Sequence, residues 1–230
     1  MKANNPGPFS DKVAGILLAA GVSSRMGRTK QLLPAGGGIL LECVLGASLE
    51  SDLAGVVLVL GHQADRIRSA LGRYLAHPKL EVVTNRQYET GMSSSIITGL
   101  ARVDREYDHV MILLGDIPSI RSELINHLRR SYLRSEQPIG AVKSGQKWSH
   151  PVMFRRDLYA ELYRLQGDSG GRQLLDRYNR HVCLVDPVGL YSDKDIDTPE
   201  DYARFLSGEW DPEPDGSVTA GKDLSHQWIS

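Results

Sequence analysis

Cysteine is scarce in this sequence, and the little that is present is dispersed. The 230 residues include two cysteines, Cys43 and Cys183, and each lies within an apolar pattern. Disulfide frameworks and thiolate metal sites need cysteines that recur at short, regular spacings. We therefore expect both residues to be reduced side chains of the core, and we expect neither a disulfide nor a metal site made from them.

An excess of charge of either sign is also missing. Lys and Arg number 27 and Asp and Glu number 28, which gives a formal net charge of -1. A surface that binds nucleic acid or membranes broadly needs a basic excess, so this balance leaves only local anion binding. We expect small-molecule partners, with no nucleic acid and no membrane.

Long apolar runs are absent as well. No stretch approaches the roughly 20 apolar residues of a membrane-spanning helix. The first residues, MKANNPGPFSDK, lack the apolar core of a secretion signal. The sequence therefore predicts a cytoplasmic protein.

The sequence contains instead a regular alternation of short buried strands and amphipathic helices. Strands are predicted at residues 13–20, 55–60, 80–83, 109–114, 138–142, 151–154 and 182–185. Helices are predicted at 39–49, 64–75, 122–133, 156–165 and 173–178, and a polar turn at 143–149. This order predicts an α/β fold with three layers, a doubly wound and mostly parallel sheet between two layers of helices. We expect residues 1–206 to form a single domain and 207–230 a mobile polar C-terminal tail, in which Trp210 or Trp228 could dock on the body.

The loop after the first strand has the composition of a phosphate-binding loop. Gly21 and Gly27 bracket the residues VSSRM, and Lys30 follows. Main-chain N–H groups, two serine hydroxyls and the charges of Arg25 and Lys30 suit a polyphosphate at the end of a strand. The spacing excludes a P-loop, in which Lys directly follows the second glycine, and the pattern G-x-G-x-x-G is absent. We interpret the segment as a nucleoside triphosphate loop.

Residues 18–30, LAAGVSSRMGRTK, resemble a known signature, L-A-A-G-x-S-x-R-M-G-x-x-K. It belongs to nucleotidyltransferases of the nucleotide-diphospho-sugar transferase fold, and more narrowly to the MobA-like NTP transferases that make molybdenum cofactor nucleotides. The resemblance covers about residues 13–206. It implies catalytic roles for Arg25 and Lys30, which would neutralise charge on the phosphates. The nucleotide-binding residues that it implies are Leu18, Ala19, Ala20, Gly21, Ser23, Ser24, Gly91, Ser93 and Ser94.

The segment GMSSS at residues 91–95 has a simpler alternative reading. Serines at the start of a helix often cap it, because their hydroxyls satisfy main-chain groups that have no partner inside the helix. The resemblance favours a place beside the base and ribose of the nucleotide.

Two carboxylates from distant parts of the chain are candidates for a metal site. Asp116 follows the strand 109–114, at the strand end where open α/β sheets bind ligands, although it could simply cap the next helix. Thr198 and Pro199 form a favourable helix start, which leaves the preceding Asp195 and Asp197 unexplained. The resemblance implies that Asp116 and Asp197 hold Mg²⁺, with Asp195 as the fallback, and carboxylate oxygens are ligands that this ion prefers.

The second half of the chain offers candidates for an acceptor site. His150 in HPVMF could bind an acceptor or only satisfy a turn. Arg172 ends the segment GDSGGR, in which Asp168 or Ser169 would cap a helix. The family has a similar segment, G-D-x-G-A-R, and Gly171 here replaces its Ala. The resemblance therefore implies that His150 and Arg172 contact an anionic acceptor.

The resemblance implies a nucleotidyltransferase that transfers CMP from CTP to the phosphate of molybdopterin and releases pyrophosphate. A phosphate monoester has a second pKa of about 6 and needs no general base. We expect three partners: the nucleoside triphosphate, a molybdopterin-type or other phosphorylated acceptor, and a molybdenum hydroxylase that receives the product. GTP remains the alternative to CTP, since the guanylyl and cytidylyl branches share the loop.

Two other functions compete with this prediction. A sugar 1-phosphate nucleotidyltransferase would use the same site, but its loop of the kind G-x-G-T-R-x-x-P-x-T-K is not matched by residues 22–24. A non-catalytic chaperone for the molybdenum cofactor would have no need to retain Arg25, Lys30, Asp116 and Asp197.

Overall fold

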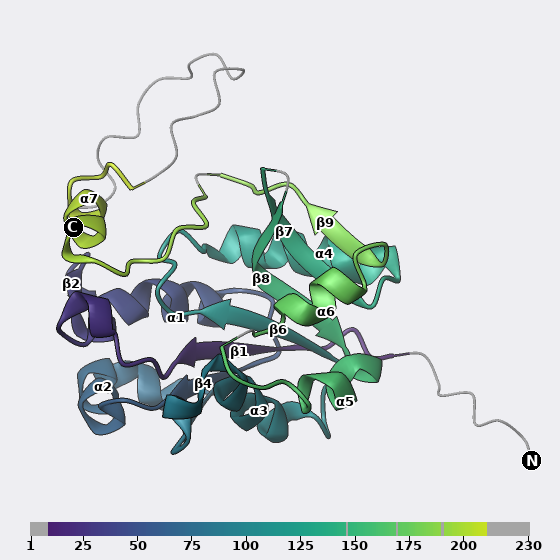
Figure 1. The fold of residues 1–230 in the computed structure, drawn as a ribbon, viewed down its shortest axis with the longest axis horizontal. Helices are drawn as coiled ribbons and strands as arrows, with labels where there is room; N and C mark the ends of the chain where they lie inside the picture. Colours follow the sequence, from purple (N-terminus) through teal and green to yellow (C-terminus); the bar gives the residue numbers. More distant parts are fainter. Residues whose placement is uncertain (1–8, 146, 169, 190, 211–230) are drawn as a thin grey trace, which may run out of the picture.

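The fold is built around one seven-stranded sheet, seen in a computed structural model that describes residues 9–210 except 146, 169 and 190 (Figure 1). The strand order is β5-β4-β1-β6-β8-β7-β9. The strands are β1 Val13–Ala19, β4 Gly55–Leu60, β5 Leu80–Thr84, β6 His109–Leu114, β7 Ile139–Ser144, β8 Lys147–Arg155 and β9 Val182–Val185. All seven residues of β1 are buried, because this strand lies at the centre and is covered on both faces.

The strands are mostly parallel, as predicted. β1 pairs in parallel with β4 and β6, so that Ile16 lies opposite Val57 on one side and Ile112 on the other. β8 runs antiparallel to both β6 and β7, whereas β7 and β9 are parallel. The carboxyl ends of β1, β4 and β6 therefore meet at one edge of the sheet.

Helices cover both faces of the sheet and complete the three predicted layers. One face packs against α1 Leu40–Glu50, α2 Ala64–Leu71 and α4 Ser122–Ser135. The other face packs against α3 Met92–Val103, α5 Tyr159–Leu162 and α6 Arg172–Arg177. Neighbouring residues of β1 point to opposite layers, Leu17 to the first and Ile16 to the second. Most helices begin and end within a few residues of their predicted bounds.

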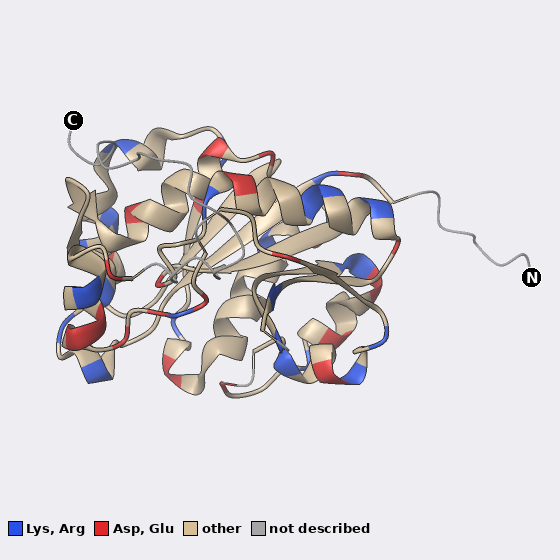
Figure 2. Ribbon diagram, turned by 90° about the horizontal axis from the view of Figure 1, so that it is seen from above, with Lys and Arg blue, Asp and Glu red and all other residues tan. Residues whose placement is uncertain are grey.

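Charged side chains lie outside this apolar centre. Figure 2 shows basic and acidic residues interspersed along the helices and loops, while the strands of the sheet are almost entirely uncharged. No helix among the described residues combines the length and the apolar character that crossing a membrane requires. Cys43 and Cys183 are free, half-buried thiols.

Three local predictions were wrong. The polar turn at 143–149 is mostly strand: β7 continues to Ser144 and β8 begins at Lys147, with Gly145 at a φ of 57° between them. The predicted helix at 156–165 is a single turn of 3₁₀-helix, Arg156–Leu158, followed by the short α5. Helix α2 ends at Leu71 because Gly72 takes a φ of 46°, which is outside helical geometry.

The last helix, α7 Pro199–Leu206, packs on a separate small cluster. In this cluster the side chains of Met26, Leu33, Tyr202 and Trp210 are buried. A short ladder of β2 Pro34–Ala35 and β3 Gly38–Ile39 lies beside it. The remainder of the predicted tail, residues 211–230, lies outside the described residues.

Candidate active site

A cavity of about 420 Å³ opens at the carboxyl ends of β1 and β6. We call it the first cavity. The loop after β1, the start of α3, and acidic residues after β6 and before α7 form its walls. The lining residues that were predicted from the sequence are Leu18, Ala19, Ala20, Gly21, Ser23, Ser24, Arg25, Lys30, Gly91, Asp116, Asp195 and Asp197.

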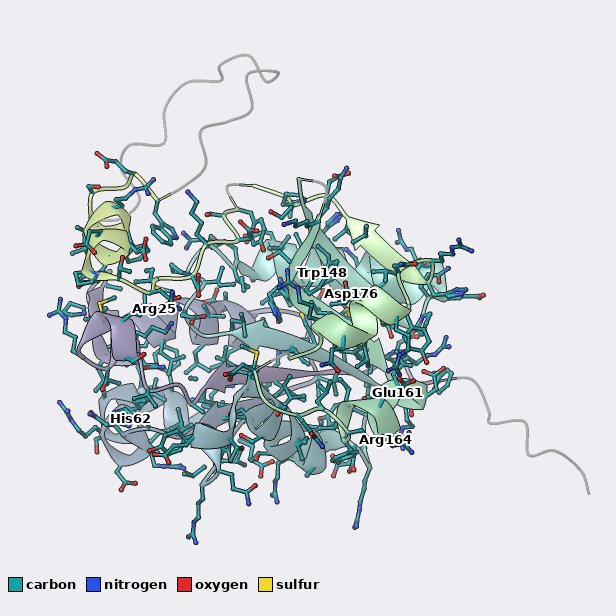
Figure 3. The ribbon with its side chains drawn as sticks, in the orientation of Figure 1. Arg25, His62, Trp148, Glu161, Arg164 and Asp176 are labelled. Carbon is teal, nitrogen blue, oxygen red and sulfur yellow. The ribbon has the colours of Figure 1, made fainter. Side chains whose placement is uncertain are left out.

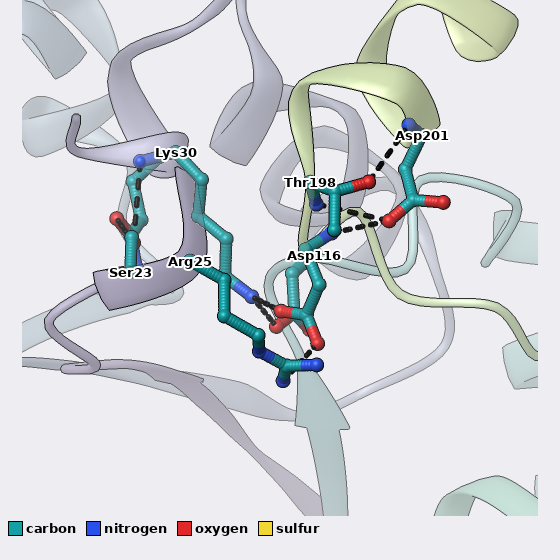
Figure 4. Close-up of polar contacts among 8 residues, drawn as sticks. Ser23, Arg25, Lys30, Asp116, Thr198 and Asp201 are labelled. Atoms are coloured by element: carbon teal, nitrogen blue, oxygen red, sulfur yellow. Dashed lines mark hydrogen bonds and ion pairs between the residues drawn. The ribbon is translucent and has the colours of Figure 1, made fainter. Parts of the chain in front are cut away.

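The loop after β1 is held in shape by its own hydrogen bonds. Ser23 has a left-handed φ of 58° and precedes a 3₁₀ turn, Ser24–Met26. The hydroxyl of Ser23 accepts a hydrogen bond from the main-chain N–H of Lys30 at 3.3 Å. Met26 is buried in the small cluster beside α7. The two ends of the loop are thereby tied together, and Lys30 projects toward the acidic residues (Figure 4).

Lys30 forms the centre of an ion-pair network. Its ammonium nitrogen lies 2.5 Å from Oδ2 of Asp116 and 2.7 Å from Oδ1 of Asp197. Arg25 pairs with the other oxygen of Asp197. Burial opposes the charge of Lys30, yet the two carboxylates outweigh burial and raise the pKa of this side chain. Burial likewise opposes ionisation of Asp197, and Lys30 is the main reason that the pKa of Asp197 lies below its usual value.

A third carboxylate completes an acidic cluster. Asp116, Asp195 and Asp197 each place one oxygen within 4.8 Å of the others. Burial, a hydrogen bond with Asp197 and the charge of Asp116 raise the pKa of Asp195 to about 6. Oδ1 of Asp116 is buried and has no hydrogen-bond partner among the described residues. Three acidic groups, one of them with an unsatisfied oxygen, fit a divalent cation such as Mg²⁺, which prefers oxygen ligands.

Main-chain contacts bring these distant carboxylates together. The N–H of Ile196, between the two later aspartates, donates to the carbonyl oxygen of Asp116 at 3.0 Å. Gly115 sits directly before Asp116, and its N–H donates to the carbonyl of Leu18 at 2.9 Å. A Cβ on Gly115 would lie 2.8 Å from the side chain of Leu41 in α1 and 3.1 Å from the carbonyl oxygen of Leu18 in β1, so a larger residue would be crowded here.

A capping box fixes the backbone behind Asp197. The hydroxyl of Thr198 accepts from the N–H of Asp201 at 3.1 Å, and Oδ2 of Asp201 accepts from the N–H of Thr198 at 2.9 Å (Figure 4). Oδ2 of Asp201 also accepts from the N–H of Asp197 at 3.2 Å. Burial opposes ionisation of Asp201, but these hydrogen bonds lower its pKa. The helix start predicted from T-P-E-D thus also positions a carboxylate of the cluster.

The serines after Gly91 divide between two roles. Ser95 lines the first cavity, whereas Ser93 and Ser94 do not. The hydroxyl of Ser94 lies 2.8 Å from the carbonyl oxygen of Gly91 and accepts from the side chain of Asn85 at 2.8 Å. The N–H of Ser93 donates to the carbonyl of Gly167. Both predicted serines are therefore engaged in holding the start of α3.

A second cavity, of about 330 Å³, adjoins the first and shares Met92 and Asp168 with it. His150, Arg172 and Trp148 line this second cavity. Nδ1 of His150 is buried without a hydrogen-bond partner among the described residues, and burial lowers the pKa of this side chain. The guanidinium carbon of Arg172 lies 5.8 Å from the centre of the Trp148 ring. The two cavities are therefore lined in part by different segments of the chain. Trp148 of the second cavity belongs to β8, whereas Arg25 of the first cavity comes from the loop after β1 (Figure 3).

The sequence matches that of a known family over most of this structure. Residues 15–182 match the family described as the MobA-like NTP transferase domain. The chain belongs to this family. The predicted resemblance is thereby confirmed, together with the nucleotide-diphospho-sugar transferase fold and the nucleotidyltransferase class.

Individual relatives of this NTP transferase carry different names. It is 30% identical over 203 residues to nicotine blue oxidoreductase of Paenarthrobacter nicotinovorans, which covers 84% of this chain and 96% of that protein. It is 25% identical to molybdenum cofactor cytidylyltransferase of Escherichia coli strain K12, covering 81% and 92%. A crystal structure of Rv0371c from Mycobacterium tuberculosis H37Rv in complex with manganese is similar at a TM-score of 0.69 and 28% identity, covering 85% and 98%.

Several residues that line the two cavities were not predicted from the sequence. Tyr88 and Glu89 occupy a 3₁₀ turn, Tyr88–Thr90, just before α3 and line the first cavity. Their position directly before GMSSS is the signal that could have identified them. Trp148 was assigned to a turn, and Asp168 was considered only as a cap of the following helix. The neighbouring Ser169 lies outside the described residues.

Proposed function

We propose that this protein is a Mg²⁺-dependent nucleotidyltransferase that transfers CMP from CTP to the phosphate of a molybdopterin-type acceptor. The observation that carries the proposal is the pairing of Lys30 with Asp116 and Asp197 beside a carboxylate oxygen that has no partner. The loop that would bind the triphosphate there meets carboxylate oxygens that would hold a cation. The similarity to a cytidylyltransferase of the molybdenum cofactor favours CTP and molybdopterin.

The reaction breaks one bond and forms one. An oxygen of the acceptor phosphate attacks the α-phosphorus of CTP, the bond from that phosphorus to the bridging oxygen of the β-phosphate breaks, and pyrophosphate leaves. Because the attacking phosphate is already ionised near neutral pH, no general base is required.

The basic side chains supply charge for the phosphates. Lys30 is buried beside its two carboxylates, so the phosphate oxygens of a bound triphosphate would compete for an ammonium group that is already in place. Arg25 is more exposed, with 71% of its side chain accessible, and suits the departing pyrophosphate. A cation held by Asp116, Asp197 and Asp195 would add further neutralisation of the phosphate oxygens.

The second cavity supports a flat acceptor. Trp148 and the guanidinium of Arg172 both offer planar surfaces, and stacking of a ring on an aromatic side chain contributes about 1–3 kcal/mol. The unpartnered Nδ1 of His150 offers a hydrogen bond to a polar ring edge. These features favour a pterin over a sugar 1-phosphate. The product would then pass to a molybdenum hydroxylase.

A second candidate function follows from the 30% identity to nicotine blue oxidoreductase. An oxidoreductase would need an electron donor, and transfer of electrons does not in itself require the three clustered carboxylates. The acidic cluster therefore favours nucleotidyl transfer.

One assay separates these functions. The protein is incubated with Mg²⁺, each nucleoside triphosphate in turn, and either molybdopterin or a panel of sugar phosphates, and pyrophosphate is measured. We expect release only with CTP and molybdopterin. Pyrophosphate release with a sugar phosphate instead would contradict molybdopterin as the acceptor. Tight binding of molybdopterin without pyrophosphate release would favour a chaperone. Bleaching of nicotine blue with a reduced nicotinamide nucleotide, without pyrophosphate release in the first assay, would favour the oxidoreductase.

A further inference from the structure

Gly167 and Asp168 lie against the first turn of α3. Oδ1 of Asp168 accepts a hydrogen bond from the main-chain N–H of Met92 at 3.1 Å, across 76 positions of sequence. The carbonyl oxygen of Gly167 accepts one from the N–H of Ser93 at 3.1 Å. The first N–H groups of a helix have no partner within it. Two of those of α3 are therefore satisfied by a loop from the second half of the chain.

This contact depends on Gly91, which precedes the helix. Its φ is +108°, and a Cβ at this position would lie 2.4 Å from the carbonyl carbon of Gly167 and 2.8 Å from Oδ1 of Asp168. Any other residue would push the loop away from α3. Gly170 approaches the same helix, since a Cβ there would lie 3.0 Å from the sulfur of Met92.

The contact lies where the two cavities meet. Met92 and Asp168 line both cavities, and Gly91 lines the first. Arg172 follows Asp168 by four residues and lines the second. Helix α3 therefore borders the first cavity and also holds the segment that leads to Arg172.

We propose that Asp168 is a positioning residue for the acceptor. By capping α3 it fixes the segment that carries Arg172, so that binding in the second cavity depends on a helix that borders the first. This inference rests on the proposed function, because it assigns the second cavity to the acceptor. It predicts that loss of the cap weakens acceptor binding more than CTP binding, even though Asp168 lines both cavities.

The kinetic test compares two substitutions of Asp168. Asp168→Ala should raise the KM for the acceptor about fivefold, the fold-change that corresponds to a lost helix cap. The KM for CTP should rise by a smaller factor, because Asp168 also lines the first cavity. Asp168→Asn should restore the acceptor KM, because Asn caps helices as well as Asp does. Asp176→Ala, a change of an exposed carboxylate on α6 (Figure 3), is the matched control and should behave as wild type.

Two results would overturn the proposal. If Asp168→Asn is as deficient as Asp168→Ala, the charge of Asp168 matters and the cap does not. If Asp168→Ala raises both KM values equally, the residue has no special relation to the acceptor.

A second measurement needs no enzymatic activity. Limited trypsin digestion of the intact protein should cut after Arg172 several-fold faster in Asp168→Ala than in wild type or Asp168→Asn, because a released segment is cleaved more readily. Equal rates in all variants would refute the cap. If instead the digestion behaves as expected while no nucleotide is transferred, the proposed function fails and the structural link stands.

Discussion

The two cavities share a border but differ in chemistry. In the first, charged groups pair with one another: Lys30 contacts Asp116 and Asp197, and Arg25 contacts Asp197, while one oxygen of Asp116 has no partner among the described residues. In the second, an aromatic ring lies beside a guanidinium, and Nδ1 of His150 has no partner among the described residues. The difference indicates that the two cavities have different roles. The charge network of the first cavity suits the chemistry on the phosphates. The second cavity is less polar and has one hydrogen-bonding atom free, which suits selection of the acceptor.

Removal of Asp116 should have the largest effect, confined to the first cavity. Asp116→Ala removes a partner of Lys30 and an oxygen available to a cation, so kcat should fall by at least the 10²–10³-fold (about 3–4 kcal/mol) that loss of one preorganised group costs. Steady-state kinetics at saturating Mg²⁺ and CTP measures it. Asp65→Asn, on the exposed side of α2, is the control. Wild-type turnover by Asp116→Ala would contradict the assignment.

Lys30→Ala should reduce kcat about a hundredfold, since it removes a buried donor near the phosphates. Its effect on metal binding should have the opposite sign. The ammonium of Lys30 competes with a cation for Asp116 and Asp197, so Mn²⁺ titration should show tighter binding in the variant. Weaker Mn²⁺ binding would mean that Lys30 supports the metal site instead of competing with it.

His150→Ala should affect only the second cavity. Loss of a hydrogen bond to a buried group should raise the KM for the acceptor about tenfold. The KM for CTP should stay at its wild-type value, because His150 does not line the first cavity. Initial rates with each substrate varied in turn measure both constants. A rise in the KM for CTP of similar size would erase the distinction between the cavities.

The pH dependence of metal binding should identify Asp195. Its pKa is raised to about 6, so a proton competes with the cation below that pH. The dissociation constant for Mn²⁺ should then rise by up to about tenfold for each pH unit below 6. In the absence of metal, the pH dependence of the free energy of unfolding has the opposite sign. Because folding raises the pKa of Asp195, this free energy falls as the pH rises through 6. Asp195→Asn should flatten both profiles, and unchanged profiles would exclude Asp195 as their source.

Thr198→Ala should have the smallest effect. It removes the hydroxyl that caps α7, which costs about 1 kcal/mol of stability. Thermal unfolding should show a modest decrease in Tm. The partner Asp201 has a lowered pKa, so its contribution is present above the ordinary carboxyl pKa and is lost as pH falls through the lowered value. A Tm equal to wild type would show that the cap is dispensable.

The sequence predicted best what is local. The loop from Gly21 to Lys30 lies within one short segment, and its predicted binding residues line the first cavity together. The strands on either side of β1 were equally clear, because strands buried on both faces are continuous apolar runs. The prediction of a turn at KSGQKWS was wrong, because polar residues also occur in exposed strands. The ends of β7 and β8 lie in this segment, and its Trp148 lines the second cavity.

Contacts between distant segments were less accessible. Asp195 and Asp197 were candidates by their position before T-P-E-D and by the family resemblance, and the hydrogen bond from Ile196 to Asp116 that unites the cluster has no signature in the sequence. Ser93 and Ser94 were selected with Gly91, yet helical geometry turns Ser95 to the first cavity. Asp168 looked like a cap of the helix that follows it, whereas it caps α3, a helix 76 positions earlier in the chain.

The proposed function requires the first cavity to transfer the α-phosphorus of CTP. The most direct test incubates the protein with Mg²⁺, molybdopterin and CTP labelled with ³²P at either the α- or the γ-position. We predict that the α-label moves to the acceptor and the γ-label appears in pyrophosphate, and that Asp116→Ala does neither. Transfer of the γ-label to the acceptor, or transfer of the α-label at an undiminished rate by Asp116→Ala, would contradict the account.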